Sequence, residues 1–262
     1  MNTILESLHS RKSVRVFTDR EISPKEKQQI LTAATQAPTA GNQQMYTILD
    51  ITDQRLKEIL AETCDHQPFI AKAKMVLIFC ADYQKWYDAF SFFGCSPRKP
   101  AAGEFLLAVQ DAAIAAQNAV TAAESLGIGS CYIGDIMEHY EKHRELLNLP
   151  PYVFPAIMVV FGYPTQQQAD RQKPKRAPLD FIVQENRYHR ADETTLKACL
   201  NTATGTLSFE EWIQRFCKRK YHSDFSNEMS RSIEEALKNF LLDIDCLNEL
   251  QPWTGHFNLF DV

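Results

Sequence analysis

The sequence lacks the short motifs that would assign an enzyme class by themselves. No GxxxxGK[ST] phosphate loop occurs in its 262 residues, which excludes a P-loop kinase or ATPase, and no GxSxG motif marks a nucleophilic serine. The glycines at 127, 129 and 134 have the wrong spacing for a dinucleotide fingerprint and lie between an expected helix and an expected strand. The chemistry therefore has to come from residues that lie apart along the chain.

Long apolar runs and paired cysteines are also missing. Every apolar stretch is interrupted well before the ~18 residues of a membrane span, and the N-terminus shows neither an apolar signal region nor a cleavage site. The seven cysteines have no CxxC or zinc-finger spacing, which is typical of reduced thiols. The net charge of −5 argues against a dedicated binder of nucleic acid or anionic membranes. We expect a cytoplasmic protein that binds neither.

Two charged motifs admit both a functional and an ordinary explanation. His139 and His143 stand four residues apart on an expected helix, as two metal ligands would, but their charged neighbours favour a solvated face, and we expect no metal. The run 218–220 (KRK), with aromatic neighbours, has the composition of a small nucleic-acid patch. A basic helix end that matches the helix dipole is the more common explanation.

What the sequence does contain is a long, mostly apolar helix in its middle. From Glu104 onwards about 22 residues are helical in pattern, with a narrow polar stripe at Asp111, Asn118 and Ser125. A helix so apolar is expected to be buried nearly all round. Since a chain of this size has little reason to bury one helix so fully, we expect a partner subunit to cover part of it.

The segment after this helix is the first candidate for a ligand site. Gly127 is placed to end the helix in a left-handed cap, and 128–134 (IGSCYIG) then predicts a short, half-buried strand. This order places the backbone of residues 132–135 deep in the molecule, where we expect a ligand to bind.

Helices and strands are interleaved along the rest of the chain, which predicts an α+β fold with one mixed sheet. Expected helices cover 3–10, 24–36, a segment after Asp53, 138–148, 209–220 and 228–242, and expected strands cover 11–17, 46–51, 75–81 and 153–164. The aromatic segment 83–100 is expected to be irregular. We expect a main domain over 1–190 and a helical C-terminal extension over 191–262, packed on the same fold.

Two basic clusters, far apart in sequence, form the strongest functional constellation. The first is Arg11, Lys12, Ser13 and Arg15, and the second is Lys173, Lys175 and Arg176. In an acidic protein, two such clusters suggest a phosphate pocket built from charge-assisted hydrogen bonds. Either cluster alone is equally compatible with a solvated surface.

Four segments together resemble the FMN-dependent nitroreductases. They are RKSVRVFTDREIS, APTAGNQQ, AAQNAVTAAESLGIGSCYIGDI and KPKRAPLDFIVQENRY, in the family's order over about residues 1–190, and they are most similar to the NADPH-dependent, oxygen-insensitive nitroreductases and flavin reductases. The resemblance implies a mixed central sheet flanked by helices, and a homodimer with the long central helix at its interface. It also implies ping-pong hydride transfer from NADPH or NADH through FMN to nitroaromatics, quinones or flavins.

The resemblance also assigns roles to individual positions. Arg11 and Ser13 contact the FMN phosphate and ribityl chain, Lys12 lies between them, and Arg15 faces the N1/O2 edge of the ring. Gln67 meets the polar edge of the ring, and the backbone of Tyr132, Ile133, Gly134 and Asp135 lines it. Thr39, Ala40, Gly41 and Asn42 reach the flavin of the partner subunit, and Lys173, Lys175 and Arg176 form the second phosphate cluster. The flavin carries the chemistry, so no catalytic side chain is implied.

Two departures from the family pattern leave questions open. Asp135 stands where close relatives have a second glycine, so its carboxylate either lies beside N5 or points into solvent. The late loop reads KPKRAP, which leaves open whether Lys175 or Arg176 holds the phosphate. Two alternative functions also remain: a specialised flavoenzyme of the same fold, such as a heterocycle dehydrogenase or a reductive dehalogenase, and a flavin-binding regulatory protein without turnover.

Overall fold

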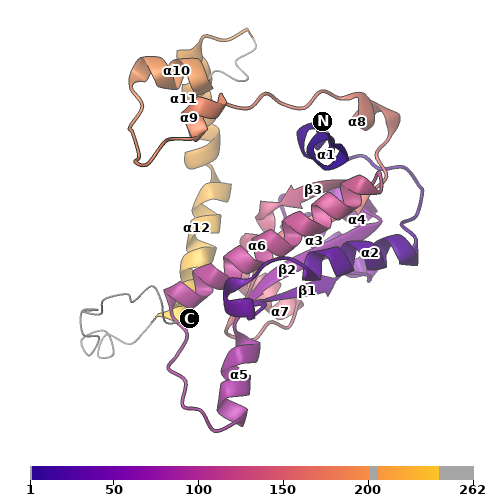
Figure 1. The fold of residues 1–262 in the computed structure, drawn as a ribbon, viewed down its shortest axis with the longest axis vertical. Helices are drawn as coiled ribbons and strands as arrows, with labels where there is room; N and C mark the ends of the chain where they lie inside the picture. Colours follow the sequence, from indigo (N-terminus) through magenta and orange to yellow (C-terminus); the bar gives the residue numbers. More distant parts are fainter. Residues whose placement is uncertain (1, 201–205, 242–262) are drawn as a thin grey trace.

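A four-stranded sheet flanked by helices forms the body of the protein (Figure 1). The computed structural model describes residues 2–200 and 206–241. The sheet has the order β1-β2-β4-β3, with β1 (Tyr46–Asp50), β2 (Met75–Asp82), β3 (Gly129–Ile133) and β4 (Val153–Gly162), and all three pairings between these strands are antiparallel. The predicted α+β class is confirmed.

The predicted strand over 11–17 is wrong. The parallel pairing that a mixed sheet requires is therefore limited to a single isolated bridge. This segment makes only two isolated bridges, a parallel one from Ser13 to Ser130 and an antiparallel one from Phe17 to Pro164. Its backbone lies close to the start of β3, because a Cβ on Gly129 would come within 2.6 Å of Val14 Cγ2. Glycine is therefore required at position 129, as a close approach of two backbones demands.

The sheet is covered by helices on both faces. β2 is buried at all eight positions, as expected for a central strand that buries both of its side-chain faces. One apolar cluster joins the sheet to α2 (Pro24–Thr35) and α6 (Ala102–Ser125), and a second joins it to α3 (Gln54–Thr63) and α4 (Phe69–Lys72). Helices α2 and α3 begin at the predicted caps, Ser23 with its capping box and Asp53.

Helix α6 is the predicted central helix, and Gly127 follows it with the predicted left-handed φ of 72°. Its alanine face is closely packed against α2 and the sheet, and Asp111 of the polar stripe is 2% exposed. Burial nearly all round is wrong for the single chain, however: Leu106, Leu107 and Ile114 are 57%, 41% and 40% exposed. These three side chains leave an apolar stripe along one side of the helix.

The remaining short elements connect the layers. They are α1 (Thr3–Ser10), η1 (Ala40–Asn42), α5 (Gln84–Phe92), η2 (Gly134–Met137), α7 (Tyr140–Leu146), α8 (Gln166–Asp170) and α9 (Leu179–Ile182). The expectation that 83–100 is irregular is wrong for α5. There Trp86 and Phe90, one helical turn apart, place their rings 5.6 Å from each other.

The C-terminal part is helical, as predicted. It contains α10 (Glu193–Leu200), α11 (Phe209–Tyr221), α12 (Asp224–Leu237) and η3 (Lys238–Phe240). Helix α12 begins earlier than the predicted 228 because Ser223 caps it, and residue 242 of that prediction lies outside the described residues. Phe240 packs edge-on against Phe105 and Tyr152, so α12 and η3 join the core of the body while α9–α11 stand apart from the sheet (Figure 1). Within the described ranges, the helices are too short or too polar to cross a bilayer.

Candidate functional site

The two basic segments meet beside the C-terminal end of α6 through one residue of the second cluster, Lys173. The Lys12 ammonium donates hydrogen bonds to the carbonyls of Ala169 and Arg171, and the Arg171 guanidinium donates to the carbonyl of Ser13. Lys173 donates to the carbonyls of Leu8 and His9, at 3.0 and 2.9 Å, where α1 ends. Cations suit a helix C-terminus, whose last carbonyls lack partners. Arg171, which the sequence reasoning missed, is the link between the segments.

Arg11 is different, because two of its side-chain nitrogen atoms have no hydrogen-bond partner in the described chain. Its Nε and Nη2 atoms are buried without a hydrogen-bond partner among the described residues, and its guanidinium lies 5.4 Å from the centre of the Tyr132 ring. Burying the donor atoms of a charged group without a hydrogen bond lowers the stability of the folded state. An anion beside Arg11 would remove that cost, so this position is the clearest sign of a ligand.

The other members of the second cluster lie apart. Lys175 and Arg176 are exposed and make no hydrogen bond or ion pair within the described part of the chain. Burial raises the pKa of Glu124, while the charges of Arg11, Lys12 and Lys173 act in the opposite sense. These three cations therefore share one carboxylate at the end of α6, without Lys175 or Arg176.

Ser13 and Arg15 lie against the neighbouring strand. Burial raises the pKa of the Cys131 thiol, and the charge of Arg15 and a hydrogen bond from Ser13 oppose that rise. Val14 is anchored to the same strand, since its N–H donates to Ser130 O at 2.9 Å. Arg11, Ser13 and Arg15 thus follow one another along the edge strand β3 toward η2.

The turn η2 carries the predicted ring-lining backbone, and it is shallower than expected. Ile133 is buried, but Gly134 is exposed and Tyr132 and Asp135 are partly exposed, because β3 is an edge strand of the sheet. A Cβ on Gly134 would meet no atom within 4 Å, so open space lies in front of this residue. A flat ligand can therefore approach the turn without displacing side chains.

Gln67 and Asp135 are brought together at this turn. Gln67 Nε2 donates to Cys64 O at 2.8 Å and to Asp135 Oδ2 at 3.1 Å, which uses both hydrogens of the amide. Its Oε1 therefore remains as the atom that it can offer to a ligand. The sequence left open whether the Asp135 carboxylate lies beside the ring or points into solvent. In the structure it points at Gln67, which lies between these two alternatives.

Several carboxyl groups gather around Glu138, the residue that follows η2. Burial first, and then the negative charges of Asp135, Asp65 and Glu228, together raise the pKa of Glu138 to about 7. Glu138 is 5% exposed. A carboxyl group in this setting takes up a proton near neutral pH, so the net charge beside the turn depends on pH.

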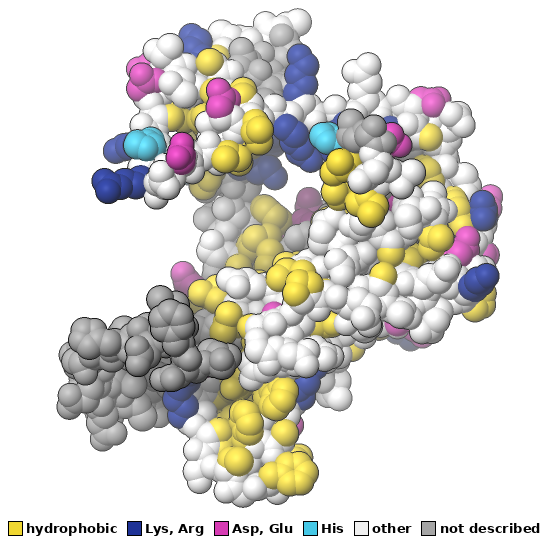
Figure 2. Space-filling model, in the orientation of Figure 1, with side chains coloured by type: hydrophobic (Ala, Val, Ile, Leu, Met, Phe, Trp, Pro, Cys, Tyr) yellow, Lys and Arg dark blue, Asp and Glu magenta, His cyan; other side chains and the backbone are white. Residues whose placement is uncertain are grey.

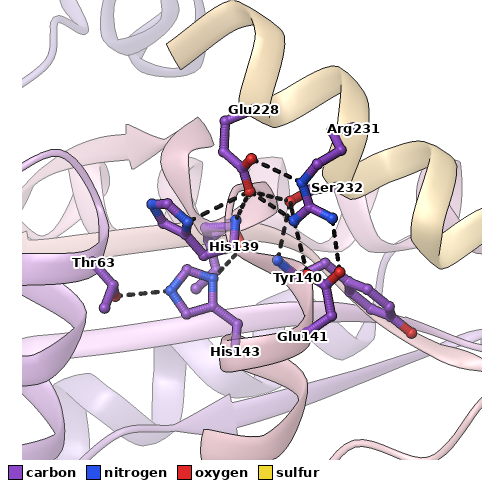
Figure 3. Close-up of polar contacts among 9 residues, drawn as sticks. Thr63, His139, Tyr140, Glu141, His143, Glu228, Arg231 and Ser232 are labelled. Atoms are coloured by element: carbon purple, nitrogen blue, oxygen red, sulfur yellow. Dashed lines mark hydrogen bonds and ion pairs between the residues drawn. The ribbon is translucent and has the colours of Figure 1, made fainter. Parts of the chain in front are cut away.

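The prediction that His139 and His143 share a solvated face is wrong for His143, which is fully buried. His143 Nδ1 lies 2.9 Å from Ile136 O, and Nε2 lies 2.8 Å from Thr63 Oγ1 (Figure 3). A carbonyl only accepts, so Nδ1 carries the hydrogen and Nε2 accepts from the threonine hydroxyl. Burial lowers the pKa of His143, so the ring is neutral. The ring joins η2 to α3, and no metal-ligand cluster occurs among the described residues.

The predicted loop 39–42 lies elsewhere in this chain. Asp111 holds it, because its carboxylate accepts from the N–H groups of Ala40 and Met45, both at 3.0 Å. Asp111 precedes Glu124 by 13 residues on α6, which separates the loop from the basic end by ~20 Å. One chain does not bring Thr39, Ala40, Gly41 and Asn42 to Arg11.

The cavity next to the basic end is small. Its volume is about 240 Å³, and Lys12, Glu124 and Gly129 are among its lining residues. Ligand pockets commonly reach ~300–1,000 Å³, so this cavity by itself is smaller than a typical cofactor site. A cavity of about 710 Å³ lies in the tail, lined by residues between Phe181 and Leu196, and contains none of the predicted site residues.

Comparison with known proteins agrees with this geometry. The chain is 35% identical over 197 residues to the oxygen-insensitive NADPH nitroreductase of Salmonella typhimurium, covering 75% of this chain and 79% of that protein. It is 29% identical to a Bacillus subtilis FMN reductase [NAD(P)H], over 89% of this chain and 90% of that one. The structure of NfrA2 from B. megaterium superimposes with a TM-score of 0.81 at 25% identity, over 93% of this chain and 100% of that one. The sequence model of the Nitroreductase family matches residues 8–163, more than half of the chain, and the chain therefore belongs to the Nitroreductase family.

Proposed function

We propose that this chain is an FMN-dependent oxidoreductase that takes hydride from NADPH or NADH. The observation that carries this proposal is that Nε and Nη2 of Arg11 are buried without a hydrogen-bond partner in the described chain, beside the edge strand that ends in the open turn η2. The matched relatives named as an NADPH nitroreductase and an FMN reductase support the same cofactor and electron donor.

The residues present fit FMN. Arg11 would bind the phosphate, with Ser13 next to it, and Lys12, Lys173, Lys175 and Arg176 would complete the positive field. Arg15 would face the ring edge that becomes negative on reduction. Gln67 Oε1 would accept from a ring N–H, and the backbone of Tyr132, Ile133, Gly134 and Asp135 would lie against the ring.

We further propose that two copies of the chain build the site. The exposed stripe of Leu106, Leu107 and Ile114 on α6 gives a partner subunit an apolar surface to cover. Figure 2 shows hydrophobic side chains gathered over this part of the body, and a hollow between the body and the tail. A second copy would also bring its loop 39–42 to the basic end, which the same loop of one chain does not reach.

Bound FMN would supply the hydride chemistry, linking a nicotinamide donor to a two-electron acceptor. The chain's own residues then have three tasks. Arg11 fixes the cofactor through its phosphate, Arg15 stabilises negative charge, and Gly134 leaves a ring face open to one flat molecule at a time. An open face suits small acceptors such as nitroaromatics, quinones or flavins. The six described cysteines are free thiols, which supports a reducing, cytoplasmic setting.

The direct test is the absorption spectrum of the purified protein, before and after anaerobic addition of NADPH or NADH. We expect a flavin spectrum that bleaches with one nucleotide and returns with a quinone or a nitroaromatic. Bleaching without reoxidation by these acceptors would favour a specialised flavoenzyme. A colourless protein that does not take up added FMN would overturn the proposal.

A further inference from the structure

Helix α7 begins without a cap of its own. Its N-cap residue His139 has left-handed angles, φ 49° and ψ 44°, and the His139 side chain accepts no capping hydrogen bond. The first N–H groups of a helix have no acceptor within the helix and need one from elsewhere. Here His139 N donates to Glu228 Oε1 at 3.2 Å, and Tyr140 N donates to Ser232 Oγ at 3.1 Å. Both acceptors come from α12 in the C-terminal tail.

The two acceptors are themselves held in place (Figure 3). Arg231 donates to both carboxylate oxygens of Glu228, at 2.8 and 2.9 Å, and to both of Glu141, at 2.7 and 2.8 Å. Ser232 is fully buried and donates to Glu228 Oε1 at 3.0 Å. Paired contacts between arginine and carboxylate fix orientation as well as distance. The Glu228 oxygen is therefore aimed at the start of α7.

The start of α7 is coupled to the turn η2. Only Glu138 and His139 separate Met137, the last residue of η2, from α7, and Glu138 N donates to Asp135 O at 3.1 Å. From within α7, His143 holds the carbonyl of Ile136, as described above. Helix α12 also contacts η2 directly. A shift of α7 would therefore move the backbone of Gly134 and Asp135.

We propose that Glu228 and Ser232 are positioning residues, which hold η2 in its ligand-binding geometry by capping the amides of His139 and Tyr140 from the C-terminal tail. This proposal rests on the proposed function, because it takes η2 as the turn that lines FMN. It gives α12 a role in the flavin site although the helix contributes none of the predicted FMN contacts.

The test compares four variants with the wild-type protein. Ser232→Ala removes the acceptor of Tyr140 N, Glu228→Ala removes the acceptor of His139 N, and Glu228→Gln removes the charge but keeps an oxygen. Glu234→Gln is the control, because Glu234 lies exposed on the same helix and its side chain makes no hydrogen bond within the described chain. For each protein the dissociation constant of FMN, the midpoint potential of the bound flavin and the thermal midpoint of the apoprotein are measured.

We expect Ser232→Ala and Glu228→Ala to raise the dissociation constant roughly three- to tenfold, the factor that corresponds to loss of a helix cap. We expect Glu228→Gln to have a smaller effect and Glu234→Gln to have none. The midpoint potential should shift in the two alanine variants, because a displaced turn changes the affinities for oxidised and reduced flavin unequally. Amide hydrogen exchange over residues 134–141 of the apoprotein should become faster in the same variants.

Two results would overturn the proposal, and both differ from a failure of the proposed function. One is a lower thermal midpoint with unchanged affinity, potential and amide exchange, which would make the contacts purely stabilising. The other is an equal effect of Glu228→Gln and Glu228→Ala, which would leave charge and not capping as the cause. If the wild-type protein binds no FMN, the proposed function fails first, and the role in positioning a flavin fails with it.

Discussion

The two sides of the candidate site differ in how completely their polar groups are paired. On the basic side, Arg11 keeps two buried nitrogen atoms without a partner in the described chain. On the opposite side, the turn η2 is held by Gln67, by His143 and, through the start of α7, by Glu228. Buried donor atoms of a cation that lack a hydrogen-bond partner indicate where a ligand supplies the acceptor. A turn held by contacts from three separate segments indicates that its backbone geometry is important for the site.

The largest expected effect is the loss of stability on removal of His143, which holds η2 on the side opposite Arg11. We expect His143→Ala to lower the free energy of unfolding by about 3 kcal/mol, because it leaves a cavity and deprives Ile136 O and Thr63 Oγ1 of a buried partner. Urea unfolding of the apoprotein measures this, with His9→Ala as the control, since His9 is exposed. A loss below ~1 kcal/mol would mean that water replaces the ring.

The same residue gives this side a pH dependence. Burial lowers the pKa of His143 from 6.5, so below that pH the unfolded chain binds more protons at this position than the folded one. Its contribution to stability is therefore present above pH ~6.5 and is lost as the pH falls. We expect the wild-type protein to lose stability from pH 7 to 5.5 more steeply than a His143→Gln variant.

On the basic side, replacing Arg11 should weaken ligand binding without lowering the stability of the apoprotein. We expect Arg11→Met to weaken FMN binding roughly 30- to 150-fold, the equivalent of a charged hydrogen bond of about 2–3 kcal/mol. The apoprotein should be equally stable or more stable, since two buried donor atoms without a hydrogen-bond partner are removed. Fluorescence titration with FMN and thermal unfolding measure the two effects. The control is Arg55→Ala, at an exposed arginine on α3, and an equal loss in that variant would contradict a specific role for Arg11.

A smaller effect is expected from Glu138, the buried carboxyl group beside η2. The pKa of Glu138 is raised from 4.5 to about 7, so the folded protein holds this proton over a range where the unfolded chain has lost it. Its contribution to stability is present below pH ~4.5 and is lost as the pH rises through 7. Glu138→Gln should therefore raise stability by about 1–2 kcal/mol at pH 8 and leave it unchanged at pH 4. Unfolding of the exposed control Glu145→Gln at both values checks this, and a gain at both would show that charge is not the cause.

The contrast between the two sides also explains what the sequence could predict. The capping boxes at Ser23 and Ser208 and the left-handed Gly127 were predictable because each depends on neighbours within a few residues. The approach of Lys173 to the first basic segment was predictable because two basic clusters in an acidic protein suggest a shared anion. The burial of His143 was not, because its partner Thr63 lies 80 residues away and charged neighbours hide it.

Other errors have the same physical origin. Ser232 and Glu228 cap amides about 90 residues distant, and no local pattern marks such a contact. The strand expected over 11–17 has the right alternation, but its partner β3 accepts it at a single bridge. For helix α6 the composition predicted burial with a partner subunit covering part of it, but composition could not say that Leu106, Leu107 and Ile114 are the side chains that one chain leaves exposed.

The smallest expected effect concerns the residue that departs from the family pattern. Asp135→Asn keeps an oxygen for Gln67 Nε2 and removes one negative charge from the turn. Because a carboxylate beside the ring opposes the arrival of electrons, we expect the flavin midpoint potential to rise by about 10–30 mV, as measured by anaerobic redox titration at low salt. The control is Asp180→Asn, at an exposed residue of α9. If the potential does not move, solvent screens the carboxylate, and the acidic turn then affects the site through its shape alone.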